Sequence, residues 1–114
     1  MAVDRGVEYG LLVHFPRAVI TPHISDKLLK PMSALDFRLG GLYLLIVNDG
    51  AGDWHITDCG LTYNRLDKNG VADLAAKGIK LGEQNELYLM TRDYDFINDI
   101  QKMVIELGKY YKNV

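Results

Sequence analysis

The sequence is poor in features that define whole classes of proteins. Its single cysteine, Cys59, excludes a disulfide within the chain, which favours a reducing compartment. Its longest apolar run, 42–47, is far shorter than the roughly 20 residues that a membrane-spanning helix needs. The first residues lack the pattern of a signal peptide. We therefore expect a cytoplasmic protein with no membrane partner.

An excess of charge of one sign is also missing. There are 13 Lys and Arg residues against 15 Asp and Glu, and the net charge is -2. A nucleic-acid-binding domain would need a basic patch, here made by Arg17, Lys27, Lys30 and Arg38. Because the basic residues are dispersed along the chain, the sequence disfavours a nucleic-acid partner.

What remains is typical of one globular domain over 1–114. The apolar share is 48% and the charged share is 25%. Apolar residues alternate in the segment 7–15, which predicts a strand with one buried face. Pro16 would end this strand, and a short extended piece over 18–20 precedes Pro22. The segment 25–30 is expected to form a helical turn.

The middle of the chain predicts a meander of three strands. Gly40-Gly41 separates 34–39 from 42–47, and two adjacent glycines favour a hairpin turn. A polar turn then leads to a strand at 54–57. A final strand is expected at 86–91.

Helical spacing follows in three places. The segment 61–69 has apolar residues at near-helical spacing, with Gly70 in the C-cap position. A second short helix is expected at 71–77. A C-terminal helix carries an apolar stripe made by Phe96, Ile100, Met103, Val104, Leu107 and Tyr111. The expected fold is α+β, an antiparallel meander of about four to five strands with helices largely on one face and the C-terminal helix packed on the sheet.

The segment from Trp54 to Thr62 contains most of the side chains that are capable of chemistry. A structural interpretation accounts for the turn, since Asp58 can accept bonds from backbone N–H groups at the helix start, Gly60 can adopt a positive φ and Thr62 is a second cap. The alternative is a small enzyme in which His55 and Asp58 form an acid–base pair and Cys59 is a nucleophile. We favour the structural interpretation and predict no catalytic residue.

Metal and cofactor motifs are not expected. His14, His23 and His55 are widely spaced and form no metal-binding pattern. The acidic residues Asp93, Asp95 and Asp99 lack the glycine and the closing glutamate of an EF-hand. The glycine pairs lie between strands, whereas phosphate-binding loops lead into helices.

Tyrosine is the abundant aromatic residue, with seven against three phenylalanines. Its rigid apolar ring and polar tip make it a favoured interface residue. The sequence therefore predicts a partner-binding surface that includes Tyr94, Tyr110, Tyr111 and the loop residue Asp49.

The central segment also carries a family likeness. The strand and turn 54–62, followed by Leu66 and Gly70, then Gly78-Ile79 and the strand 86–89, resemble the pattern of domain-of-unknown-function family 1828. The resemblance covers about 35–107, and Cys59 stands where that family has a second acidic residue. It implies a small bacterial or phage domain without an established chemistry.

These observations together predict a non-catalytic protein that binds a macromolecular partner, most simply another protein. A phage-encoded inhibitor of a host defence nuclease, such as an anti-CRISPR, is one form of this prediction. The sequence leaves the oligomeric state open, a homodimer included.

Overall fold

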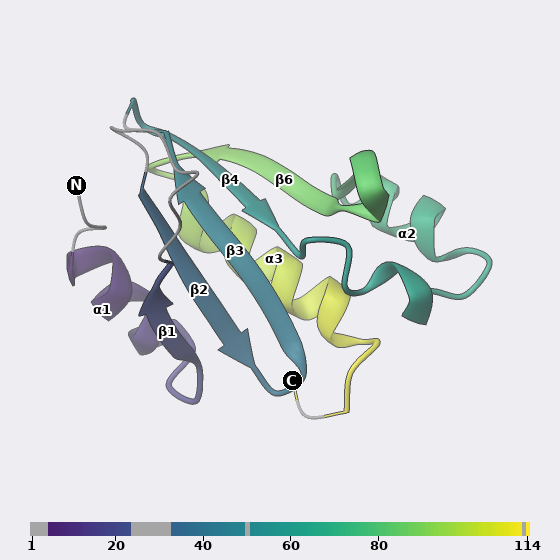
Figure 1. The fold of residues 1–114 in the computed structure, drawn as a ribbon, viewed down its shortest axis with the longest axis horizontal. Coiled ribbons are helices and arrows are strands. Elements are labelled where there is room, and N and C mark those ends of the chain that lie inside the picture. Colours follow the sequence, from purple (N-terminus) through teal and green to yellow (C-terminus); the bar gives the residue numbers. More distant parts are fainter. Residues whose placement is uncertain (1–4, 24–32, 50, 113) are drawn as a thin grey trace.

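The computed structural model describes residues 5–23, 33–49, 51–112 and 114. Within these residues, the centre of the fold is one antiparallel sheet (Figure 1). Its strands are β1 (Val19–Pro22), β2 (Ser33–Leu39), β3 (Leu42–Asn48), β4 (Asp53–Thr57), β5 (Lys80–Leu81) and β6 (Leu87–Arg92). They lie in the order β1-β2-β3-β4-β6-β5, so the sheet has six strands and exceeds the four to five expected.

Three helices and two 3-10 turns complete the described chain. The helices are α1 (Arg5–His14), α2 (Gly70–Ala76) and α3 (Phe96–Gly108), and the 3-10 turns are η1 (Tyr63–Arg65) and η2 (Glu83–Asn85). Helices and an antiparallel sheet in one unit confirm the α+β class.

The predicted meander is confirmed. Leu39 pairs with Leu42 across the Gly40-Gly41 turn, where Gly40 has a φ of 58°. Strand β4 then pairs with β3, and β6 pairs with the other side of β4. The two additional strands are edges. β1 tolerates Pro22 because an edge strand has one side without ladder bonds. β5 is a two-residue strand in the segment between α2 and β6, for which no strand was expected.

One face of the sheet carries the core. The fully buried side chains of the strands include Leu35, Phe37, Leu44, Ile46 and Ile56. Helix α3 covers this face with the predicted stripe, since Phe96, Ile100, Met103, Val104 and Leu107 are buried (Figure 1). The ring of Phe96 stacks on Trp54 with centroids 4.5 Å apart, which ties the first turn of α3 to β4.

Helix α1 replaces the strand predicted for 7–15, so that prediction is wrong. Leu11 is completely buried in the core, and the half-buried Val7 and Phe15 pack beside it. Spacing of four residues places these three side chains on one side of a helix. The ring of Phe15 meets that of Phe37 edge-on at 5.3 Å, so α1 covers the same face of the sheet as α3.

The helix predicted over 61–69 is also wrong. Only Tyr63–Arg65 is helical there, as the 3-10 turn η1, and Gly70 begins α2 instead of ending a helix. The expected helix at 71–77 is confirmed as α2, and Gly78 follows it with a φ of 87°. The helical turn predicted at 25–30 lies outside the described residues.

Candidate functional site

The turn after β4 is organised around a buried carboxylate. Asp58 is fully buried. One of its carboxylate oxygens accepts bonds from the backbone N–H groups of Gly60 and Leu87, and the other accepts a bond from Thr62 N–H, each at 2.8 Å. The Asp58 side chain therefore holds the turn itself and joins it to the start of β6.

The three predicted turn residues take somewhat different roles from those expected. Gly60 has the positive φ, 81°, that its position was predicted to need. Thr62 precedes η1 without capping it through its side chain, and its hydroxyl lies 2.7 Å from the Tyr111 hydroxyl. Asp58 binds N–H groups of the turn and of β6 rather than those of a helix.

The side chains of the alternative enzyme site point to different partners. His55 Nε2 lies 3.1 Å from Glu86 Oε2, and its ring stacks on Tyr88 with centroids 5.2 Å apart. Asp58 is occupied by the three backbone N–H groups. Cys59 is exposed at a backbone position with a φ of 58°. Its own N–H group donates to Thr57 Oγ1 at 3.0 Å.

The thiol of Cys59 lies in an acidic environment. It borders an open hollow of about 370 Å³ with Glu83, Gln84 and Glu86. Although Cys59 as a residue is exposed, the atoms around its thiol displace part of the surrounding water, and this desolvation is the main cause that raises the pKa of the thiol. The negative charges of Asp58 and Glu86 raise it further. A nucleophilic cysteine needs a lowered pKa, so this environment favours the unreactive thiol.

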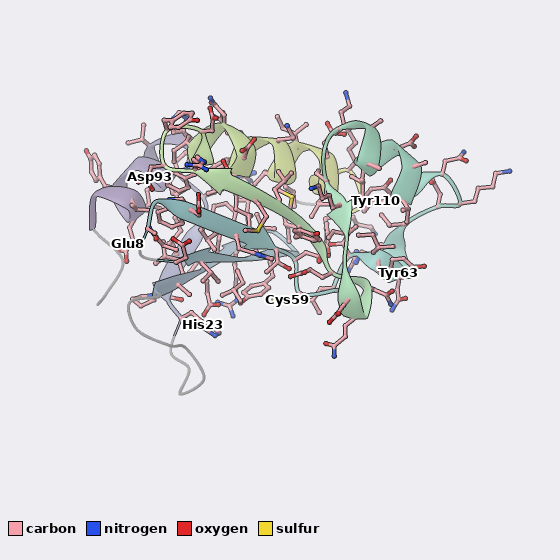
Figure 2. The ribbon with its side chains drawn as sticks, turned by 90° about the horizontal axis from the view of Figure 1, so that it is seen from above. Glu8, His23, Cys59, Tyr63, Asp93 and Tyr110 are labelled. Atoms are coloured by element: carbon pink, nitrogen blue, oxygen red, sulfur yellow. The ribbon has the colours of Figure 1, made fainter. Side chains whose placement is uncertain are left out.

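A second polar cluster lies on the face of the sheet opposite α3. Asp36 on β2 accepts a hydrogen bond from the Tyr43 hydroxyl, and its carboxylate lies 2.9 Å from His23 Nδ1. Burial and the bond to Asp36 raise the pKa of Tyr43 far above its ordinary value. Figure 2 shows His23 and Cys59 on the side of the sheet away from α3. The sequence did not single out this cluster, because its members come from separate segments.

The predicted partner-binding residues are scattered over the molecule. Tyr94 is 80% exposed in the turn between β6 and α3. Tyr111 is half-buried beneath the guanidinium of Arg65, which lies 4.2 Å above its ring, and Tyr110 is half-buried beside Gly70. Asp49 accepts bonds from the N–H groups of Ala51 and Asp53 and shapes its own loop.

Among the described helices and strands, α1 carries the largest group of exposed apolar side chains. Tyr9 is 72% exposed, Leu12 40% and Val13 64%. Their spacing of three and four residues places them on one side of the helix, away from the buried Leu11. We call these three residues the α1 stripe. The sequence analysis missed it because it assigned this segment to a strand, in which Tyr9 and Val13 would share a face with Leu11.

Comparison of the chain with family models, curated proteins and solved structures finds no match. The likeness to domain-of-unknown-function family 1828 therefore stays a prediction. In the described part of the chain, no group of three or more His, Cys, Asp and Glu side chains is arranged to hold a metal ion. No described helix is long and apolar enough to cross a membrane.

Proposed function

We propose that the protein is a non-catalytic module that binds a protein partner in the cytoplasm, and that the α1 stripe makes the contact. The observation that carries this proposal is the high exposure of three neighbouring apolar side chains on a helix whose opposite side is anchored in the core. Single exposed apolar residues are common on protein surfaces, whereas a contiguous group usually marks an interaction site.

The partner surface that fits the stripe is an apolar groove able to receive one side of a helix. Anchors three and four residues apart are the pattern by which a helix binds in such a groove. The stripe carries one polar atom, the Tyr9 hydroxyl, so we expect a largely uncharged groove. Because Leu11 fixes α1 to the sheet, the helix meets its partner already folded, which lowers the entropic cost of binding.

The environment of the alternative catalytic residues supports a non-catalytic role. Asp58 has its carboxylate committed to three backbone N–H groups, and the raised pKa of Cys59 keeps its thiol protonated at neutral pH. A nucleophile and a base need to lie within hydrogen-bond reach of each other. His55 instead pairs with Glu86.

A more specific version of the proposal is that the protein is a phage-encoded inhibitor of a host defence nuclease. This form rests on the family likeness, which implies a bacterial or phage domain, and on the slight acidity and the abundant tyrosines of the chain. Tyr94, highly exposed like the stripe, is included as a second contact. Loss of target cleavage by a purified defence nuclease on addition of the protein is the expected result for this form.

The test is capture of the partner by the full chain, followed by reconstitution from purified proteins and titration calorimetry. A variant with Tyr9→Ser, Leu12→Ser and Val13→Ser removes the stripe and leaves Leu11 in place. We expect it to weaken binding at least about 100-fold, since each truncated anchor costs on the order of 1 kcal/mol or more. Ile105→Ser is the matched control, because Ile105 is 61% exposed on α3.

Circular dichroism and thermal unfolding establish that the variants are folded. Binding of the purified partner by the triple variant with wild-type affinity would overturn the α1 stripe as the contact. An equal loss of binding in Ile105→Ser would do the same.

A further inference from the structure

The sheet face opposite α1 and α3 bears half-buried side chains in its middle. We call this the open face and define it by Arg38, Tyr43, Leu45, Val47, His55, Tyr88 and Glu86. Among residues 5–23, 33–49, 51–112 and 114, no α-helix lies against it, since α1 and α3 pack on the opposite side and α2 contributes Leu74 to the same core. Figure 2 shows α3 on one side of the sheet and Cys59 on the other.

The open face also carries Asp36 on β2 and Lys80 on β5, which pairs with Tyr88. One row of this face, at the level of Arg38, has opposite charges at its two ends. Arg38 on β2 pairs with Tyr43 on β3, and its guanidinium lies 5.1 Å above the Tyr43 ring. Cys59 comes two residues after Thr57, which pairs with Leu45 two residues beyond Tyr43. Glu86 follows on the far side, because Thr57 pairs with Tyr88 and Asp58 N–H donates to Leu87 C=O. One row therefore runs from a cation at β2 to an anion just before β6.

The centre of this row lies between β3 and β4. In the strand order, β2 and β6 are equally far from this centre, on opposite sides. Consider a two-fold axis that runs parallel to the strands and lies in front of this centre, between two copies that face each other. It would bring β2 of one copy opposite β6 of the other. Each copy's Arg38 would then face the other copy's Glu86. In this row the open face is thus complementary in charge to itself.

From this complementarity we propose that the open face binds a second copy of the chain, face to face, as a symmetric dimer. The interface uses the same surface on both copies, which is the commonest form of protein dimer. Tyr43, Leu45, Val47 and His55 come from the two central strands and lie around the axis. Two sheets in this arrangement pack with their strands roughly aligned at about 10 Å separation.

The mixed charge distinguishes this occupant from others. A nucleic acid would need a surface of one positive sign, whereas Arg38 here is balanced by Glu86 in the same row. The dimer is independent of the proposed function, because the α1 stripe lies on a helix that covers the other face of the sheet.

The test is the mass of the full chain in solution over a range of concentrations, measured by analytical ultracentrifugation. The wild-type protein is expected to dimerise. Arg38→Glu places an acid opposite Glu86 of the other copy, and Glu86→Arg places two cations opposite each other. Each change acts twice in a symmetric dimer, so each variant alone should raise the dissociation constant at least about tenfold.

An equimolar mixture of the two variants provides the decisive measurement. In the mixed dimer, the acid at position 38 of one copy meets the arginine at position 86 of the other, and the remaining contact keeps Glu86 opposite Arg38. We expect the mixture to form a heterodimer with a dissociation constant within about threefold of the wild-type value. This rescue also shows that neither variant fails for lack of folding.

Asp73→Arg on α2 and Lys77→Glu at the C-cap of α2 make the same changes of charge outside the open face and should leave the dimer intact. A wild-type chain that stays monomeric at high concentration would overturn the proposal. So would a mixture that stays monomeric, or a dimer that persists in both single variants and is lost when the α1 stripe is removed.

Discussion

At the scale of single residues, the Asp58 carboxylate joins two parts of the chain that are 29 positions apart. It binds the N–H groups of Gly60 and Thr62 in its own turn and that of Leu87 at the start of β6. Bonds from N–H groups to a charged acceptor are stronger than neutral ones, and a buried acceptor that loses them is costly. The turn and β6 are therefore held by one side chain.

Substitution of Asp58 by Asn is expected to lower the free energy of unfolding by about 2–4 kcal/mol, since an amide cannot accept all three bonds and has its own donors to satisfy. Asp67→Asn is the matched control. The Asp67 carboxylate accepts one bond from Asn69 N–H in an exposed turn, so its loss should cost at most about 0.5 kcal/mol. Urea unfolding followed by the fluorescence of Trp54 measures both changes, and equal costs would contradict the role assigned to Asp58.

At the scale of elements, α1 shows why alternation of apolar residues is an ambiguous signal. Val7, Leu11 and Phe15 are four residues apart and pack on the core, whereas Tyr9 and Val13 are also four apart and stay exposed. Together they produce a period of two along the sequence. A helix with an apolar group on each side therefore imitates a strand with one buried face.

The neighbours Leu11 and Leu12 offer a direct check of this helix. Leu11 is 0% exposed and Leu12 is 40% exposed. Leu11→Ala should lower the free energy of unfolding by about 2–4 kcal/mol through the cavity that it leaves. Leu12→Ala should change it by about 0.5 kcal/mol or less. Denaturant unfolding measures both changes. If Leu12→Ala lowered the free energy of unfolding more than Leu11→Ala, the side of α1 assigned to the core would be wrong.

The elements that were predicted correctly have signals contained in short stretches. Gly40-Gly41 between two apolar runs locates the β2–β3 hairpin, and the stripe from Phe96 to Leu107 locates α3. Both depend on local conformational preference and on periodicity, which a sequence displays directly.

The elements that were missed depend on contacts between distant segments. Only η1 is helical in the segment 61–69, where a longer helix was expected. The chain just before η1 is held by Asp58 and by the bond between the hydroxyls of Thr62 and Tyr111. The cluster of His23, Asp36 and Tyr43 forms only when β1 and β2 lie beside β3. The sequence therefore located the turn residues individually, and the partners of their side chains required the fold.

At the scale of the whole molecule, the network around Tyr43 makes stability depend on alkaline pH. Burial and the hydrogen bond to Asp36 raise the pKa of Tyr43 above its ordinary value of about 10. The folded state thus favours the protonated phenol. Its contribution to stability is complete below about pH 10 and is lost progressively as the pH rises from there toward the raised pKa.

We expect the stability difference between the wild-type protein and Tyr43→Phe to be constant between pH 7 and about pH 9.5 and to shrink above about pH 10. Urea unfolding at a series of pH values measures the difference. Absorbance at 295 nm should show one tyrosine fewer among the late-titrating groups in the variant. A difference that does not change with pH would contradict the raised pKa.

The turn at Gly60 has a consequence for how this protein varies among its relatives. A Cβ atom at position 60 would lie 2.6 Å from the backbone oxygen of Gln84, and Gln84 and Asn85 themselves have φ values of 54° and 63°. The turn at Gly60 and the 82–86 loop are therefore in close contact, and neither can change its conformation without a change in the other. Among homologous chains, we expect Gly60 and the length of the 82–86 loop to change together or not at all.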